Sequence, residues 1–208
     1  MSRNNDRLSG PVESSQAPEQ TSSRLLDFVK PTQFVELPSK GRHYPKGHPL
    51  KDKEVIEINF MTAKDEDILS SRSLLKNGTA IDRFLQNIIT DNKISVDSLL
   101  IGDKNAIIVD SRISAYGREY KTEVTCPSCS TKDKIEYDLQ EKRTTHPSLP
   151  EGVQSTENGT FKFKLPVSGF EAEIRLLTSK DESLILKRSK DKKKGSVDTS
   201  FTDQYKLI

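Results

Sequence analysis

Apolar positions recur with two different periods along this chain. In residues 54–60 they alternate with polar positions, which is typical of a half-buried strand. In residues 80–89 they fall at i, i+1, i+4, i+5, i+8 and i+9, which predicts an amphipathic helix. Two more helices are predicted, over residues 62–78 and 103–117, each with a glycine near its end. The second of these is expected to bury one face, made of Ala106, Val109, Ile113 and Tyr116.

The period of two returns in the second half of the chain as two β-hairpins. Residues 119–140 alternate on both sides of a turn that holds Cys126 and Cys129, so a CxxC knuckle forms the tip of the first hairpin. A second hairpin is predicted on both sides of residues 166–169. Its apolar side chains include Phe170 and Ile174, and we expect them to be buried, with an exposed interface as the alternative.

Two segments of the chain resemble one another. Residues 58–66 and 174–182 each read as an alternating strand, then a threonine, then Lys-Asp-Glu. Threonine followed by acids in the first turn is typical of a helix N-terminus. The repeat predicts a duplicated strand-to-helix design in an α+β fold, with a second copy cut short; convergent capping chemistry is the alternative.

The patterns divide the chain into six parts. The first part is predicted to be disordered, because its polar residues offer no apolar surface to offset the entropy of ordering. The parts are a tail (1–24), a Pro-rich extended strap (25–53), a strand plus helical unit (54–118), the CxxC-tipped hairpin (119–140), a second hairpin plus helix (141–190), and a basic and polar linker with the C-terminal segment (191–208).

Composition narrows the class of protein. The 208 residues carry 33 Lys+Arg against 31 Asp+Glu, so a net charge of +2 gives no global attraction to nucleic acid or membranes. No apolar run approaches the roughly 20 residues that span a bilayer, and the first residues lack a signal peptide's apolar region. Two cysteines so close together cannot form a disulfide that cross-links distant parts of the fold. The sequence therefore favours a protein of the reducing cytoplasmic interior.

The CxxC knuckle is the strongest candidate metal site. Cys126 and Cys129 have the spacing of one half of a tetrahedral zinc site, and His146 is a candidate third ligand. A degenerate or incomplete zinc ribbon is the favoured interpretation, because no second CxxC follows. His43 and His48 lie in the strap and are interpreted as ordinary turn residues.

No catalytic motif is found. The sequence lacks a Walker loop, a GxGxxG segment and a nucleophile elbow, so we expect neither an enzyme nor a small-molecule substrate. The basic run at residues 187–194 is interpreted as a solvated helix end. Binding of nucleic acid phosphates through this run is the less favoured alternative.

Four segments carry a family resemblance: residues 36–45, 61–69, 99–106 and 116–129. They resemble the baseplate hub proteins of T4-type bacteriophages. The resemblance implies a late viral protein without catalysis or cofactor, needed to assemble the hub of a contractile-tail baseplate through contacts with other hub and tail proteins. It places the protein in the host bacterial cytoplasm during assembly and leaves open whether it stays in the virion. The alternatives are a transient tail-assembly chaperone absent from the virion and a zinc-ribbon-like nucleic-acid-binding adaptor.

Overall fold

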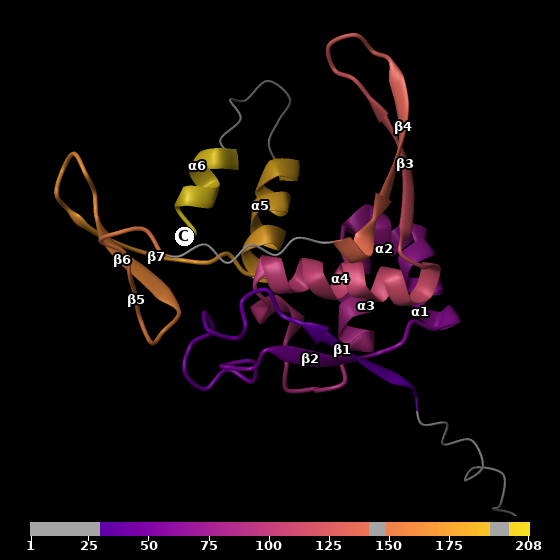
Figure 1. Cartoon of the computed structure of the whole chain (residues 1–208), viewed down its shortest axis with the longest axis horizontal. Coiled ribbons are helices and arrows are strands. Elements are labelled where there is room, and N and C mark those ends of the chain that lie inside the picture. The colour runs from indigo at the N-terminus through magenta and orange to yellow at the C-terminus, as the bar shows by residue number, and fades with distance from the viewer. Residues whose placement is uncertain (1–29, 142–148, 192–199) are drawn as a thin grey trace, which may run out of the picture. The chain divides into compact units, whose positions relative to one another are not determined.

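The fold is α+β, as predicted, and consists of short helices and three small antiparallel sheets (Figure 1). The computed structural model describes residues 30–141, 149–191 and 200–208. The predicted tail (1–24) and His146 lie outside the described residues, as do residues 192–194 of the basic run. In the described part, no helix is both long enough and apolar enough to cross a membrane.

The first sheet pairs β1 (Thr32–Glu36) with β2 (Val55–Asn59) in antiparallel register, with Val35 opposite Ile56. Strand β2 was predicted, whereas β1 was not, because the strap was interpreted as extended and turn-rich throughout. The alternation in β1 is short and ambiguous. Val35 points into the core, but its neighbour Phe34 is 71% exposed.

Three short helices follow β2. The single helix predicted over residues 62–78 is divided at Ser71, whose extended backbone separates α1 (Ala63–Ser70) from α2 (Arg72–Asn77). Gly78 ends α2 in the left-handed conformation, with φ +75°, as the sequence predicted. Helix α3 (Ala80–Ile88) buries the predicted apolar stripe except for Ile81, which is 37% exposed.

Helix α4 (Ile101–Tyr116), preceded by the 3₁₀ turn η1 (Val96–Ser98), was predicted, but its buried face was not. The expected face of Ala106, Val109, Ile113 and Tyr116 is wrong: the first three are only partly buried and Tyr116 is exposed. The buried positions of α4 are instead Asp103, Lys104, Ile107 and Ser111. Polar side chains occupy this face because, as described below, distant residues hydrogen bond them.

The apolar core belongs to the first half of the chain. Its buried side chains come from β1, the strap, β2, α3, the segment around η1 and the start of α4. Met61, just before α1, and Ile68 and Leu69, in its last turn, pack against this core. The buried members are Val35, Leu37, Tyr44, Leu50, Ile56, Ile58, Phe84, Leu85, Ile88, Ile89, Ile94, Val96, Leu99, Leu100 and Ile107.

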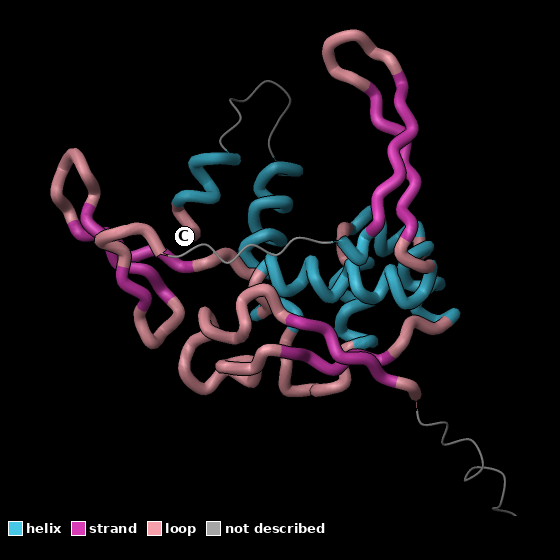
Figure 2. The backbone as a smooth tube through the Cα atoms, viewed as in Figure 1, coloured by secondary structure: helices cyan, strands magenta, loops and turns pink. Residues whose placement is uncertain are grey.

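The second sheet is the predicted CxxC-tipped hairpin. Strands β3 (Glu119–Thr125) and β4 (Lys132–Asp138) pair only with one another among the described residues, and η2 (Leu139–Glu141) follows them. Figure 2 shows this pair as a long two-stranded ribbon closed by one loop.

The third sheet contains β5 (Gln154–Ser155), β6 (Thr160–Lys164) and β7 (Glu171–Arg175). β6 and β7 form the predicted second hairpin, but burial of its apolar side chains was the wrong expectation, since Phe170 is 72% exposed and Ile174 37%. No member of the described apolar core lies in this hairpin, although His43 of the strap contacts Phe161 of β6. Helix α5 (Ser179–Asp191) follows β7, and α6 (Ser200–Tyr205) lies in a segment interpreted as linker.

Candidate functional site: a buried junction at the start of helix α4

Asp103 fastens the strap to the first turn of α4. Its carboxylate accepts hydrogen bonds from the Ser39 backbone N–H (2.9 Å), the Ser39 hydroxyl (2.6 Å) and the Tyr44 hydroxyl (2.8 Å). Asp103 is fully buried. Three donors satisfy the buried charge, and an acid in the first turn also suits the helix dipole.

Tyr44 extends this network toward η1. Its hydroxyl accepts a hydrogen bond from the Leu100 backbone N–H (3.2 Å), and its ring stacks on His48 at 4.4 Å between centroids. Burial and the neighbouring Asp103 carboxylate raise the pKa of Tyr44 far above its usual value, so the phenol keeps its proton. Tyr44 therefore donates to Asp103 at any physiological pH.

His48 adds a second tie between strap and η1. Its Nδ1 accepts from the Leu50 backbone N–H (3.1 Å), which leaves the ring proton on Nε2 to be donated to the Ser98 hydroxyl (2.9 Å). Burial lowers the pKa of His48, which favours this neutral ring.

Lys104, the next residue along α4, joins a different set of elements. Its ammonium contacts Asp82 of α3 and Glu182 of α5, both at 3.0 Å, and donates to the Ser179 hydroxyl at 2.9 Å. Burial lowers the pKa of Lys104, but the two carboxylates outweigh burial, so the net shift is upward and the side chain stays charged. Lys104 therefore links the first half of the chain to α5.

Backbone hydrogen bonds reinforce the Lys104 link. The Ser179 N–H donates to the Leu99 carbonyl (2.8 Å) and the Ile101 N–H to the Leu177 carbonyl (3.1 Å), on either side of an antiparallel bridge between Leu100 and Thr178. The start of α5 and the start of α4 are thus held to each other by both backbone and side chains.

The strap also contacts the third sheet. The ring centroids of His43 and Phe161 lie 5.1 Å apart, and Lys46 forms an ion pair with Glu157. Gly159 allows this approach, because a Cβ at that position would lie 2.1 Å from the His43 carbonyl oxygen. Gly159 also has φ +77°, which favours glycine.

A groove of about 1130 Å³ runs between these elements. Its walls include Arg42 and His43 of the strap, Gly102 of α4 and Leu176 after β7. The buried Nδ1 of His43 has no hydrogen-bond partner among the described residues, and burial lowers the pKa of this histidine.

The repeated segments make the same local contacts. Thr62 donates to Asp65 through its N–H (2.9 Å) and hydroxyl (2.6 Å), and Thr178 donates to Asp181 in the same way (2.9 Å for both). Arg175 adds two hydrogen bonds to Asp181, at 2.6 and 2.9 Å, and these hold the pKa of Asp181 down at about 2. The predicted pair of capped helix starts is therefore present.

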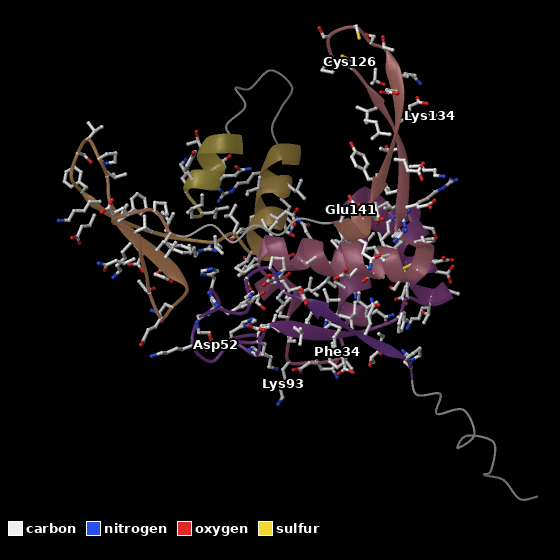
Figure 3. All side chains as sticks on the ribbon, in the orientation of Figure 1. Phe34, Asp52, Lys93, Cys126, Lys134 and Glu141 are labelled. Atoms are coloured by element: carbon white, nitrogen blue, oxygen red, sulfur yellow. The ribbon has the colours of Figure 1, made fainter. Side chains whose placement is uncertain are left out.

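The predicted metal residues lie elsewhere, in the loop of the β3–β4 hairpin (Figure 3). Cys126 and Cys129 are both free thiols. The Thr131 hydroxyl, the backbone and the Cys126 thiol hydrogen bond to Cys129 and lower the pKa of its thiol to about 7. In the described part of the chain, no three His, Cys, Asp or Glu side chains form a metal-binding group.

Exposed apolar side chains gather at the end of the β6–β7 hairpin. Val167 is 98% exposed and Phe170 72%, and Leu165 is also exposed. Surface clusters of this kind mark binding surfaces in soluble proteins.

Sequence reasoning located Cys126, Cys129 and both Thr–Asp caps, but it missed Asp103, Lys104 and Tyr44. These side chains carry no motif of their own. The one available signal was their position inside the family-like segments at residues 36–45 and 99–106, which the structure brings into contact.

A search of curated proteins and a search of solved structures each found no match. The family model described as "T4 bacteriophage base plate protein" matches residues 31–203, which include the strap from residue 31 onward, the α4 junction and both hairpins. The chain therefore belongs to the T4 bacteriophage base plate protein family.

Proposed function

We propose that this baseplate protein acts without catalysis, as a hub subunit or hub-assembly factor of the contractile tail, through contacts with other hub and tail proteins. The observation that carries the proposal is the exposed apolar end of the β6–β7 hairpin, at Leu165, Val167 and Phe170. Large apolar side chains at a loop tip cost free energy in water, and a partner that covers them recovers it.

The sequence motifs support the finer assignment, within the baseplate family, to the hub. The segments at residues 36–45 and 99–106 resemble hub proteins, and within the family the hub subunit encoded by gene twenty-six of phage T4 is the proposed counterpart. Late expression and assembly in the host cytoplasm follow from that assignment. The buried junction holds the segment directly after β7, because Lys104 and the Leu100–Thr178 bridge contact the start of α5.

A complementation experiment tests the role of the hairpin end. In infected cells that lack the natural protein, Val167→Ser combined with Phe170→Ser is expected to reduce completed baseplates at least tenfold, while the chain still folds. Ser168→Ala, in the same turn, is the matched control and is expected to leave assembly unchanged. Normal assembly by the double variant would contradict a docking role for this end.

Quantitative mass spectrometry separates the two roles left within the proposal. A hub subunit is present at fixed stoichiometry in both baseplate precursors and mature particles, whereas a transient chaperone is present in precursors alone. Absence from both would contradict the hub assignment.

A zinc-ribbon-like nucleic-acid adaptor is the second candidate, favoured by the free thiols at the hairpin tip. It requires DNA or RNA affinity that falls steeply with salt, because phosphate binding releases counterions. Binding that is absent at low salt would remove this candidate.

A further inference from the structure

The loop that joins β3 to β4 is a tight turn that contains both cysteines. The Cys126 N–H donates to the Thr131 carbonyl and the Ser130 N–H to the Cys126 carbonyl, both at 2.9 Å. Ser130, directly after the second cysteine, has φ +57°, a left-handed conformation that residues other than glycine adopt rarely. This tight turn places both cysteines in one short loop at the end of the hairpin.

Two thiols make half of a tetrahedral site. Structural zinc takes four ligands, and thiolate sulfur is among those it prefers. The chain has two cysteines in total, and no described group of three His, Cys, Asp or Glu completes the set. His48 is already engaged with Leu50 and Ser98, and His43 packs against Phe161. An all-cysteine site therefore requires a second chain.

The faces of the hairpin indicate which chain that is. In the strand register, Tyr120 pairs with Tyr137 and Thr122 with Ile135, so one face is largely apolar, with Asp133 near the tip. Tyr137 is 47% and Tyr120 39% exposed, the Tyr120 ring has the Arg112 guanidinium 5.3 Å from its centroid, and no third strand covers the ribbon among the described residues. The opposite face carries charged side chains such as Lys121 and Glu136, which pair across the strands.

We propose that two copies of this chain share one zinc ion, bound by Cys126 and Cys129 of each copy. A two-fold axis parallel to the hairpins brings the two tips together, so the four thiolates meet at one end while the two apolar faces pack against each other. Such an interface is self-complementary, since each copy presents the same surface. A second copy therefore satisfies both the ligand count and the one-sided apolar face.

The test uses full-length protein, stripped of metal and kept reduced, with zinc added stepwise. Native mass spectrometry is expected to detect conversion of a monomer to a dimer that holds one zinc per two chains. Cobalt in place of zinc is expected to give the strong charge-transfer absorption and tetrahedral spectrum of four thiolates. Cys126→Ser and Cys129→Ser should each abolish metal binding and dimer formation together, whereas Ser128→Ala, between them, should retain both.

A second pair of variants tests the packed faces. Tyr137→Lys is expected to weaken the zinc dimer about tenfold or more, which is the usual effect of losing a central aromatic contact at an interface. Lys134→Ala, on the opposite face of the same strand, is expected to leave the dimer unchanged. Both positions lie far from the apolar core, so urea unfolding of the metal-free variants should match that of the natural chain.

Three results would overturn the proposal. One is a monomer with one zinc per chain that loses its zinc in His146→Ala, which would place the site within a single chain. Another is the absence of stoichiometric zinc at micromolar concentration. The third is a dimer that forms equally well without metal or without the two cysteines.

Discussion

The two strand-to-helix units of this protein share their local chemistry and differ in what surrounds it. In each unit a threonine donates two hydrogen bonds to the aspartate that opens the helix, Thr62 to Asp65 and Thr178 to Asp181. Four residues before each threonine lies an isoleucine of the strand. Ile58 is 0% exposed, whereas Ile174 is 37% exposed.

The difference follows from the partners of each unit. Strand β2 of the first unit lies against the end of α3, where Ile58 bridges to Ile89 and Asn59 donates to the Ile88 carbonyl, and Asn87 of α3 donates to Asp65. In the second unit the aspartate is bound by Arg175 of its own strand. Local sequence therefore determines how a helix begins, and the packing of later elements determines whether the strand before it is buried.

The comparison predicts its largest effect at the matched isoleucines. Ile58→Ala should lower the free energy of unfolding by about 2–5 kcal/mol, because it leaves a cavity in the core. Ile174→Ala should lower it by no more than about 0.5 kcal/mol, since its side chain already contacts water. Urea unfolding followed by circular dichroism measures both, and equal losses would show that the second unit is buried as well.

Asp103→Ala tests how much the polar junction between the strap and α4 stabilises the first half of the chain. It leaves the Ser39 and Tyr44 donors without their acceptor, and we expect a loss of about 2–4 kcal/mol in the free energy of unfolding. Asp97→Ala, at an exposed acid in η1, is the matched control and should stay within about 0.5 kcal/mol of the natural chain. If both variants unfold at the same urea concentration, the Asp103 network does not stabilise the fold.

Gly159→Ala tests the contact of the third sheet with the strap. A Cβ there meets the His43 backbone, and φ is +77°, so the loop must move and stability should fall by about 2 kcal/mol. Gly152→Ala is the control, since φ is +86° but no atom lies within 4 Å, and about 1 kcal/mol is expected from backbone strain alone. Hydrogen exchange at β5 and β6 should accelerate in the first variant, and unchanged protection would argue against this contact.

The smallest effect concerns the pH dependence of the second unit. The pKa of Asp181 is about 2 in the fold against an ordinary value of 3.8, so its stabilisation is complete above about pH 4 and is lost as the pH falls through 2. The free energy at stake is about 1–2 kcal/mol. An NMR titration of the Asp181 carboxyl measures the pKa directly. In Arg175→Leu that pKa should rise toward 3.8, and a value that stays at 2 would assign the shift to the Thr178 hydrogen bonds.

The sequence was sufficient for elements whose signals are local. Period and capping located β2, α3 and both hairpins, because each depends on residues a few positions apart. Asp103 and Lys104 were not recognised as buried, because Ser39 is 64 positions away from the first and Glu182 is 78 away from the second. No local pattern carries such pairings.

The same limit explains the other errors. The buried face of α4 was predicted from apolar residues alone. That rule selects Tyr116 instead of Asp103, which is buried together with its hydrogen-bond partners. Strand β1 was missed because its pairing with β2 spans the whole strap. Burial of Phe170 was expected because an apolar side chain in a hairpin usually has a covering layer, and the described chain provides none.

The adjacency of Asp103 and Lys104 has a consequence for the order of events during synthesis. Ser39 and Tyr44 precede Asp103 in the chain, so they have already been made when Asp103 leaves the ribosome. Ser179 is 75 positions later than Lys104, which corresponds to roughly 4–15 s at usual translation rates. The strap and α4 can therefore form their contacts through Asp103 while the Lys104 ammonium is still solvated. The later arrival of α5 completes the burial of Lys104. A nascent chain stalled before Ser179 should already protect α3 from proteolysis.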